Sequence, residues 1–296
     1  MEQRSIGDTT VSAIGLGAMP MSVDGRPDRE RSIRTVHAAL DAGVTLIDTA
    51  DAYHRASQAV GHDEVGHNEE LVVEALASYG GDTSDVLVAT KGGAIRTEDG
   101  GWRHDGRPEH IKAAAKASAL RLGVESIGLY QHHRPDPTVP YAETVGALAE
   151  LLDEGVIRRA GISNVDEDQI RLAQDVLGGR LASVQNQFSP AFRSSRGEMD
   201  LCARLGVAFL PWSPLGGMRG ATDLAQRHRA FAEVASNRGA SPYQVCLAWE
   251  LQLSPTVIPI PGASRPESIR DSVGAVDLAL TAEEVALLDG WRVPPH

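Results

Sequence analysis

Eight short apolar segments recur along the chain with helical patterns between them, and this alternation restricts the fold more than any other feature. The segments are VSAIGLG (11–17), VTLIDTA (44–50), VLVATKG (86–92), IGLYQHH (127–133), VIRRAGISN (156–164), LASVQNQFS (181–189), VAFLPWSPL (207–215) and TVIPIPG (256–262). Strands that alternate with helices pair in parallel, and runs that are apolar on both faces indicate strands covered on both sides. Eight such units in about 250 residues predict a (β/α)8 TIM barrel.

The intervening segments have clear helix boundaries. In 107–123, Pro108 stands in the first turn and Gly123 follows the last, and the segment 141–155 likewise ends in glycine. Pro early and Gly late are typical of helix starts and ends.

An open doubly wound sheet is the alternative fold. Its dinucleotide fingerprint would lie near GLGAMP (15–20), but Pro20 replaces the third glycine and no helix follows at once, so we favour the barrel. No linker-like stretch divides the chain, and we expect residues 1–296 to form a single domain.

Composition narrows the function. The formal net charge of -12 argues against a general affinity for nucleic acid or anionic membranes. Cys202 and Cys246 each lie in a predicted helix and suggest neither a disulfide framework nor a CxxC metal site. The chain has no signal-like start and no apolar run of about 18 residues, so we expect a cytoplasmic protein without a membrane span.

Polar side chains follow the predicted strands, whose carboxyl ends meet at one mouth of a barrel. They are Asp48, Tyr53, Lys91, His132, His133, Ser163, Asn164, Gln185, Asn186, Trp212 and Ser213. The pKa of a free Tyr is about 10, and a nearby ammonium moves it toward neutrality. A neighbouring carboxylate would keep the Lys side chain charged. Together Asp, Tyr and Lys predict a site that handles protons.

Each residue taken alone also has an ordinary role. Asp51 would cap the following helix, and His132 points to the opposite face of its strand from His133. Histidines at 54, 62 and 67 match no zinc pattern, so we expect exposed loop residues and no metal site. The segments 54–70 and 92–108 are interpreted as long loops on the catalytic face.

Several motifs together resemble the aldo-keto reductase family over nearly the whole chain. They are LIDTADAY, VLVATKGG, IGLYQHHRPDP, GISNV, VQNQFSP, WSPLGG and IPIPGAS. The start, RSIGDTTVSAIGLGAMPM, resembles the family's short β-hairpin, which closes the barrel floor before strand one. The resemblance implies a catalytic tetrad of Asp48, Tyr53, Lys91 and His133, with Asp48 rather than Asp51 as the acid.

The resemblance also implies a nicotinamide cofactor. The residues implied for it are Ser163, Asn164 and Gln185 at the carboxamide, Trp212 at the ring, Ser213, Leu215 and Gly216 at the pyrophosphate, and Ser264, Arg265 and Arg270 at the adenosine 2′-phosphate. Gly262 and Ala263 stand where some members have Lys and Ser. Ser264, Arg265 and Arg270 favour NADPH, and the departure at Gly262 and Ala263 leaves NADH as the alternative.

The resulting hypothesis is an NADP-dependent oxidoreductase that reduces an aldehyde or ketone, acting as a monomer or a small homo-oligomer. Two alternatives remain: a cofactor-binding regulatory subunit of the same fold, and a Schiff-base lyase that uses Lys91 as its nucleophile. The sequence does not identify the carbonyl substrate, and it leaves Trp102 with either a pocket-lining or a structural role.

Overall fold

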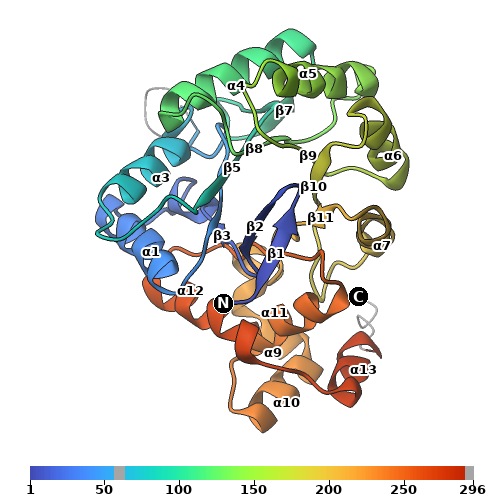
Figure 1. Ribbon diagram of the computed structural model, residues 1–296. Helices are drawn as coiled ribbons and strands as arrows, with labels where there is room; N and C mark the ends of the chain where they lie inside the picture. The colour runs from blue at the N-terminus through green and yellow to red at the C-terminus, as the bar shows by residue number, and fades with distance from the viewer. Residues whose placement is uncertain (57–63, 291–296) are drawn as a thin grey trace.

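The computed structural model describes residues 1–56 and 64–290. The chain begins with an antiparallel hairpin of β1 (Gln3–Ile6) and β2 (Thr9–Ser12), which lies across one end of the barrel (Figure 1). Ile6 and Val11 of the hairpin are fully buried in one cluster with barrel residues such as Leu46. The hairpin therefore closes the barrel floor, as predicted.

Seven parallel strands form the wall of the barrel, in the order β11-β10-β9-β8-β5-β4-β3. They are β3 (Leu16–Gly17), β4 (Leu46–Asp48), β5 (Leu87–Gly92), β8 (Leu129–His132), β9 (Ala160–Ser163), β10 (Leu181–Gln185) and β11 (Ala208–Phe209). Their order follows the chain, because each strand pairs beside the preceding barrel strand.

The eighth predicted strand, 256–262, closes the ring without forming a regular ladder. Val257 bridges to Phe209 on one side and Gly262 to Gly17 on the other, both in parallel. Pro259 and Pro261 lack an N–H, so the segment cannot donate at those positions. Their carbonyls instead accept from Gly15 and Gly17, at 2.9 and 3.0 Å. This closure confirms the predicted (β/α)8 barrel.

Helices surround the strands (Figure 1). They are α1 (Arg29–Asp41), α3 (His67–Ala77), α4 (Pro108–Leu122), α5 (Tyr141–Asp153), α6 (Glu167–Val176), α7 (Arg196–Leu205), α8 (Gly217–Thr222), α9 (Leu224–Arg227), α10 (Arg229–Arg238), α11 (Pro242–Leu253), α12 (Pro266–Val273) and α13 (Ala282–Gly290). Gly123 ends α4 in the left-handed conformation, with a φ of 67°, as the sequence predicts. Among the described helices, none combines the length and apolar character needed to cross a membrane.

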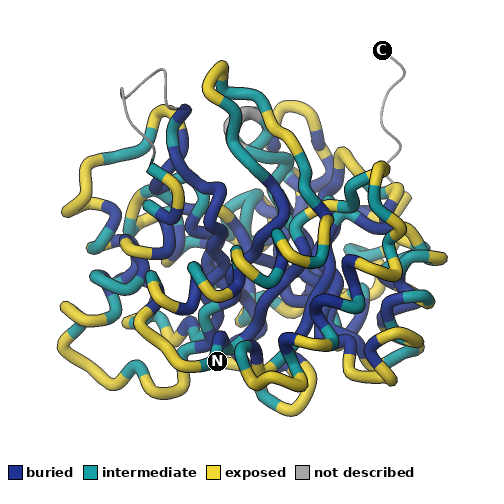
Figure 2. The backbone as a smooth tube through the Cα atoms, turned by 90° about the horizontal axis from the view of Figure 1, so that it is seen from above, coloured by how far each residue is buried: buried dark blue, intermediate teal, exposed yellow. Residues whose placement is uncertain are grey.

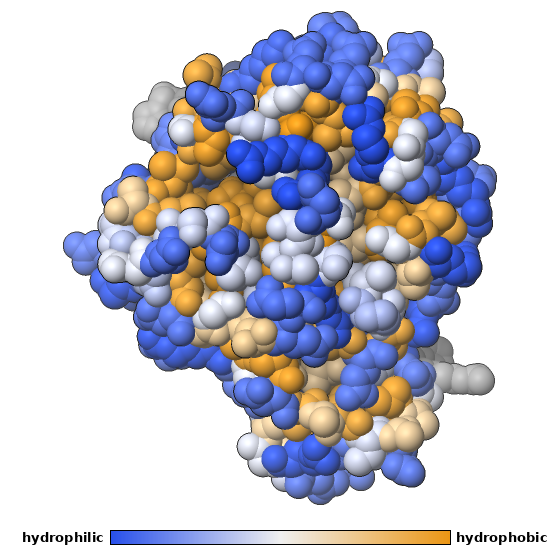
Figure 3. Space-filling model, in the orientation of Figure 1, coloured by the Kyte–Doolittle hydropathy of each residue, from blue (hydrophilic) through white to orange (hydrophobic). Residues whose placement is uncertain are grey.

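Burial follows the barrel. The strands form the buried centre in Figure 2, whereas exposed residues lie on the outer helices and loops. On the face seen in Figure 3, hydrophilic residues gather around the rim, and hydrophobic areas lie between the polar ones toward the middle. The helices thus pack their apolar sides on the sheet and turn their polar sides outward.

Three predicted boundaries were wrong. The segment 11–17 is divided between β2 and β3, because residues 13–15 separate the end of the hairpin from the first barrel strand. The segment 92–108 is not a plain loop: β6 (Ala94–Arg96) and β7 (Trp102–His104) form an antiparallel hairpin within it. The segment 54–70 ends in a helix, since α3 begins at His67.

Candidate active site

Three of the sequence-predicted residues meet in one buried group at the carboxyl ends of β4 and β5. The Lys91 Nζ donates to Asp48 Oδ2 at 2.7 Å, to the Thr49 carbonyl at 2.9 Å and to the Tyr53 hydroxyl at 3.1 Å. All three N–H groups of the ammonium are therefore occupied. Lys91 is fully buried, and Tyr53 is 7% exposed.

Burial and charge oppose each other in this group. Burial raises the pKa of Tyr53 above 10, and the Lys91 ammonium only partly offsets this. Lys91 lowers the Tyr53 pKa, as expected, but the net shift is upward because loss of solvent outweighs the nearby charge. For Lys91, burial lowers the pKa, but Asp48 and Tyr53 together raise it above its usual value, so Lys91 stays an ammonium.

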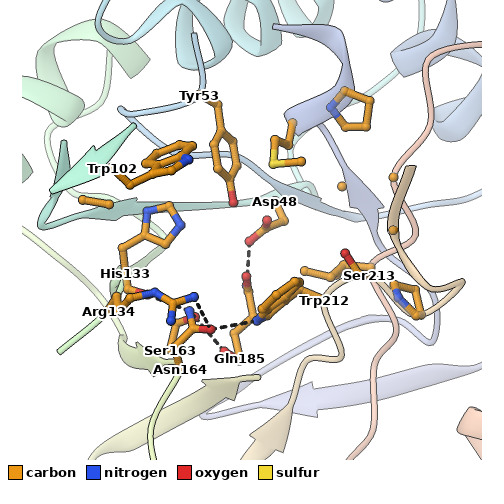
Figure 4. Close-up of a pocket in the computed structure, with 18 of the residues that line it drawn as sticks. Asp48, Tyr53, Trp102, His133, Arg134, Ser163, Asn164, Gln185, Trp212 and Ser213 are labelled. Atoms are coloured by element: carbon orange, nitrogen blue, oxygen red, sulfur yellow. Dashed lines mark hydrogen bonds between the residues drawn. The ribbon is translucent and has the colours of Figure 1, made fainter. Parts of the chain in front are cut away.

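His133 completes the predicted tetrad beside Tyr53. The two rings lie edge to face with centroids 5.5 Å apart, and Trp102 from β7 lies 6.5 Å from His133 (Figure 4). Burial and then the Lys91 charge hold the pKa of His133 well below its usual range, so the imidazole is neutral. His132 faces away from the mouth and packs against Tyr141 of α5.

The second oxygen of Asp48 is held by amides that the sequence reasoning did not assign to it. Gln185 Nε2 donates to Asp48 Oδ1 at 2.8 Å, and Gln131 Nε2 lies 3.5 Å away. Ser183 donates in turn to Gln131 Oε1 at 3.1 Å. Gln131 and Ser183 are polar residues inside buried strands, and this pattern in the sequence could have indicated that they support the site.

Asp48, Tyr53 and His133 line a cavity of about 450 Å³, and Lys91 lies behind them. The described lining residues of the cavity are Gly17, Met19, Pro20, Asp48, Tyr53, Ala94, Trp102, His104, His133, Arg134, Ser163, Asn164, Gln185, Trp212, Ser213, Pro214, Leu215, Gly217, Ala221, Ile260 and Gly262. The β6–β7 hairpin forms part of the wall and carries Trp102 into it, although the sequence had left the role of this residue open.

A second network lies across the cavity from Tyr53 (Figure 4). The Asn164 Oδ1 accepts from Trp212 Nε1 at 3.2 Å and from Arg134 Nη2 at 2.9 Å, and Asn164 Nδ2 donates to the His133 carbonyl. The Ser163 hydroxyl donates to the Gln185 carbonyl. The implied nicotinamide residues thus lie together and are linked to the backbone of His133.

Two of the implied cofactor residues have unusual backbones. Asn164 and Ser213 have φ values of 59° and 52°, and they are the non-glycine residues with positive φ in the described part of the chain. Such conformations cost free energy and cluster at functional sites. Leu215 lines the same cavity, and the Gly216 N–H donates to the Ser213 carbonyl at 2.8 Å.

Arg265 stands immediately before α12 and faces the start of α1. It lines a second hollow with Arg31, Arg34, Pro266 and Glu267. The sequence reasoning missed Arg31 and Arg34, although their spacing places both on one side of a helix. Ser264 is half-buried beside Arg265, whereas Arg270 is exposed and does not line this hollow.

Three loop residues differ from expectation. Asp51 caps no helix in the described ranges; it is buried, and its Oδ1 has no hydrogen-bond partner. His54 is buried and its Nδ1 bonds the Arg55 carbonyl, so it is not an exposed loop residue. His67 begins α3 and bonds the Ser22 hydroxyl. His62 lies outside the described residues.

The described residues contain no cluster of acidic, His or Cys side chains arranged to hold a metal. A family model, the Aldo/keto reductase family, matches residues 13–292. The chain belongs to the aldo/keto reductase family.

Named relatives of this aldo/keto reductase are oxidoreductases. An uncharacterized oxidoreductase of Schizosaccharomyces pombe is 35% identical over 96% of this chain and 88% of its own. Pyridoxine 4-dehydrogenase of Escherichia coli is 32% identical over 97% and 96%. The crystal structure of an aldo/keto reductase from Klebsiella pneumoniae, in complex with NADP and acetate, has 26% identity and a TM-score of 0.80, covering 100% of this chain and 97% of its own.

Proposed function

We propose that this protein reduces an aldehyde or ketone to an alcohol with NADPH, and that Tyr53 is the general acid. The observation that carries the proposal is the buried group of Tyr53, Lys91 and Asp48 at the wall of the cavity. A phenol that lies 3.1 Å from an ammonium can release its proton to a developing alkoxide, because the ammonium stabilises the resulting phenolate.

The residues present fit a nicotinamide cofactor. Trp212 offers a flat aromatic ring, and Ser163 and Asn164 offer hydroxyl and amide groups next to it. The strained backbones of Asn164 and Ser213 lie at this same wall and support a binding role. When bound, the reduced cofactor supplies the hydride. The NADP complex of the Klebsiella relative supports NADPH as this cofactor.

The protein residues then have distinct tasks. Neutral His133 donates a hydrogen bond to the carbonyl oxygen and orients it toward Tyr53. As charge develops on this oxygen, the Tyr53 hydroxyl gives it a proton, and the phenolate is left beside the Lys91 ammonium. Asp48 keeps Lys91 charged and in place, and Gln185 holds the other carboxylate oxygen. Because burial keeps Tyr53 protonated near neutral pH, it is ready to act as an acid.

The environment of Lys91 argues against a Schiff-base lyase. An amine must be deprotonated and reachable to attack a carbonyl. Lys91 is fully buried, and its ammonium is bonded to three acceptors.

The deciding experiment follows NADPH absorbance when the pure protein is mixed with a panel of aldehydes. We expect steady oxidation of NADPH by the wild type and almost none by Tyr53→Phe. Tight NADPH binding without turnover in the wild type would instead indicate a regulatory subunit. Borohydride trapping of substrate on Lys91 would indicate the lyase.

A further inference from the structure

The charge of the cavity is unbalanced on one side. Among its described lining residues, Asp48 and Arg134 carry formal charges. Asp48 is neutralised by Lys91, 2.7 Å away. Arg134 is exposed to solvent where it lines the cavity, and among the described residues it has no carboxylate within ion-pair distance.

The neighbours of Arg134 do not supply the missing negative charge. The rings of His104 and His133 are uncharged near pH 7 and add neither sign of charge, because burial and nearby positive charges lower the pKa of both rings. Asp136, two residues along the chain, accepts hydrogen bonds from Thr138 and from the Gly106 N–H and does not line the cavity. A solvent-exposed cation without a carboxylate partner among the described residues therefore stands where the cavity opens to solvent.

The Arg134 guanidinium has N–H donors that are not used in hydrogen bonds within the described residues. It presents five N–H groups, and the recorded bond from Nη2 to Asn164 Oδ1 uses one of them. Arg134 follows His133 directly, and Figure 4 shows its guanidinium between His133 and Asn164. A planar fork in this position can hold a carboxylate through two parallel hydrogen bonds while His133 contacts a carbonyl on the same molecule.

We propose that Arg134 selects carbonyl substrates that carry a carboxylate, so that the enzyme reduces small aldehyde acids or keto acids in preference to neutral carbonyl compounds. This inference rests on the proposed function. Ala94 and Trp102, from the β6–β7 hairpin, give the cavity an apolar face that accommodates the carbon skeleton. The carboxylate fixes the molecule at Arg134, and the carbonyl then lies beside Tyr53 and His133.

The test compares 2-, 3- and 4-formylbenzoate with their methyl esters. Each ester retains the reacting aldehyde and nearly the same size but lacks the charge. The three ring positions vary the distance between the carboxylate and the aldehyde. We expect kcat/KM for at least one acid to exceed that of its ester by about tenfold or more, the usual value of a charge-assisted contact. Arg134→Met should abolish this acid-to-ester ratio, and Arg134→Lys should retain part of it.

The ratio isolates the role of Arg134, since any effect through Asn164 on the cofactor acts equally on acid and ester. Arg171→Met, on the exposed side of α6, is the matched control and should keep the wild-type ratio. Equal kcat/KM for acids and esters in the wild type, or an unchanged ratio in Arg134→Met, would overturn the proposal.

Binding separates this proposal from the proposed function. Calorimetry with benzoate and methyl benzoate, in the presence of NADP⁺, requires no turnover. Wild type should bind benzoate at least about tenfold more tightly than Arg134→Met does. If no aldehyde is oxidised or reduced but this difference is found, the reductase proposal fails and the carboxylate site stands. Equal binding by the two proteins overturns the carboxylate site whatever the activity.

Discussion

Tyr53 is held protonated and yet placed to lose its proton. Its burial opposes ionisation, whereas the Lys91 ammonium 3.1 Å away favours it. A developing alkoxide changes this balance, because the proton then moves to a stronger base while the phenolate remains beside a positive charge. The two effects together suit a group that must give up its proton only during the reaction.

Tyr53→Phe tests this role directly. The ring is kept, but the hydroxyl that we propose as the proton donor is lost, so kcat should fall by about 10²–10⁴-fold. NADPH affinity, measured by fluorescence titration, should be nearly unchanged because the ring contacts remain. Reduction of aldehydes at close to the wild-type rate would show that the proton comes from another group.

The two adjacent histidines should differ sharply. His133 lines the cavity, whereas His132 packs against Tyr141 behind the strand. His133→Ala should lower kcat/KM by about tenfold or more through loss of a hydrogen bond to the carbonyl. His132→Ala should be much milder in steady-state assays. Comparable losses in both variants would mean that His133 supports the fold rather than the substrate.

At the scale of elements, several ionisable side chains lie close together and buried at the junction between β4 and α3. Asp51 faces Glu69 of α3, Arg121 of α4 and Lys91 of β5. Glu69 is fully buried and accepts from Arg121 Nε at 2.6 Å and from Thr90. Arg121 is therefore already engaged, and burial followed by the Glu69 charge raises the pKa of Asp51 from 3.8 to about 8.

This pKa predicts a stability that falls as pH rises. Between 3.8 and about 8 the folded protein keeps a proton on Asp51 that the unfolded chain releases. The free energy of unfolding should therefore decrease toward about pH 8, by at most about 1.4 kcal/mol for each pH unit. Asp51→Asn mimics the protonated acid and should flatten the profile in urea titrations. The exposed Asp200→Asn should not, and an equal slope in Asp51→Asn would contradict the assignment.

The start of α12 is where we expect a preference for NADPH over NADH to be set. Arg265 lies with Arg31 and Arg34 around one hollow, which concentrates positive charge there. Arg265→Ala should weaken NADPH binding by about tenfold or more, since a charge-assisted contact to phosphate is lost. NADH lacks this phosphate and should bind almost as before. Equal losses for both cofactors would assign Arg265 another role.

For the molecule as a whole, Arg4 connects the N-terminal hairpin with the segment that closes the barrel. From β1, its guanidinium donates to the Leu251 carbonyl at 2.8 Å, to the Ser254 carbonyl at 2.9 Å and to the Val257 carbonyl. These acceptors lie at the end of α11 and the beginning of the closing segment. The floor hairpin is therefore tied to the last wall segment.

Arg4→Met should destabilise the whole fold, because several buried carbonyls lose a charged donor at once. We expect a loss of about 3 kcal/mol or more in the free energy of unfolding, measured by urea titration. Arg158→Met, at an exposed position, should change it by less than about 0.5 kcal/mol. A similarly small effect for Arg4→Met would show that water replaces its contacts.

The sequence predicted the barrel because hydrophobic period, helix ends and strand order all agreed. The length of the strands was predicted less well where proline removes backbone donors. The segment 207–215 contains Pro211 and Pro214, and it pairs as a ladder strand only at Ala208 and Phe209. The placement of the implied tetrad followed from motif resemblance. Arg134 and Gln131 stand inside the motif IGLYQHHRPDP, but the motif does not reveal their contacts, because their partners, Asn164 and Asp48, lie far away in the chain.

The seam between β3 and the closing segment has a consequence for synthesis. Gly17 leaves the ribosome 245 residues before its partner Gly262 is made. At usual translation rates, one edge of β3 therefore waits roughly tens of seconds for its neighbour. We expect the nascent chain to depend most on chaperones during this interval, and newly made protein to become resistant to proteases only after its last hydrophobic segment has emerged.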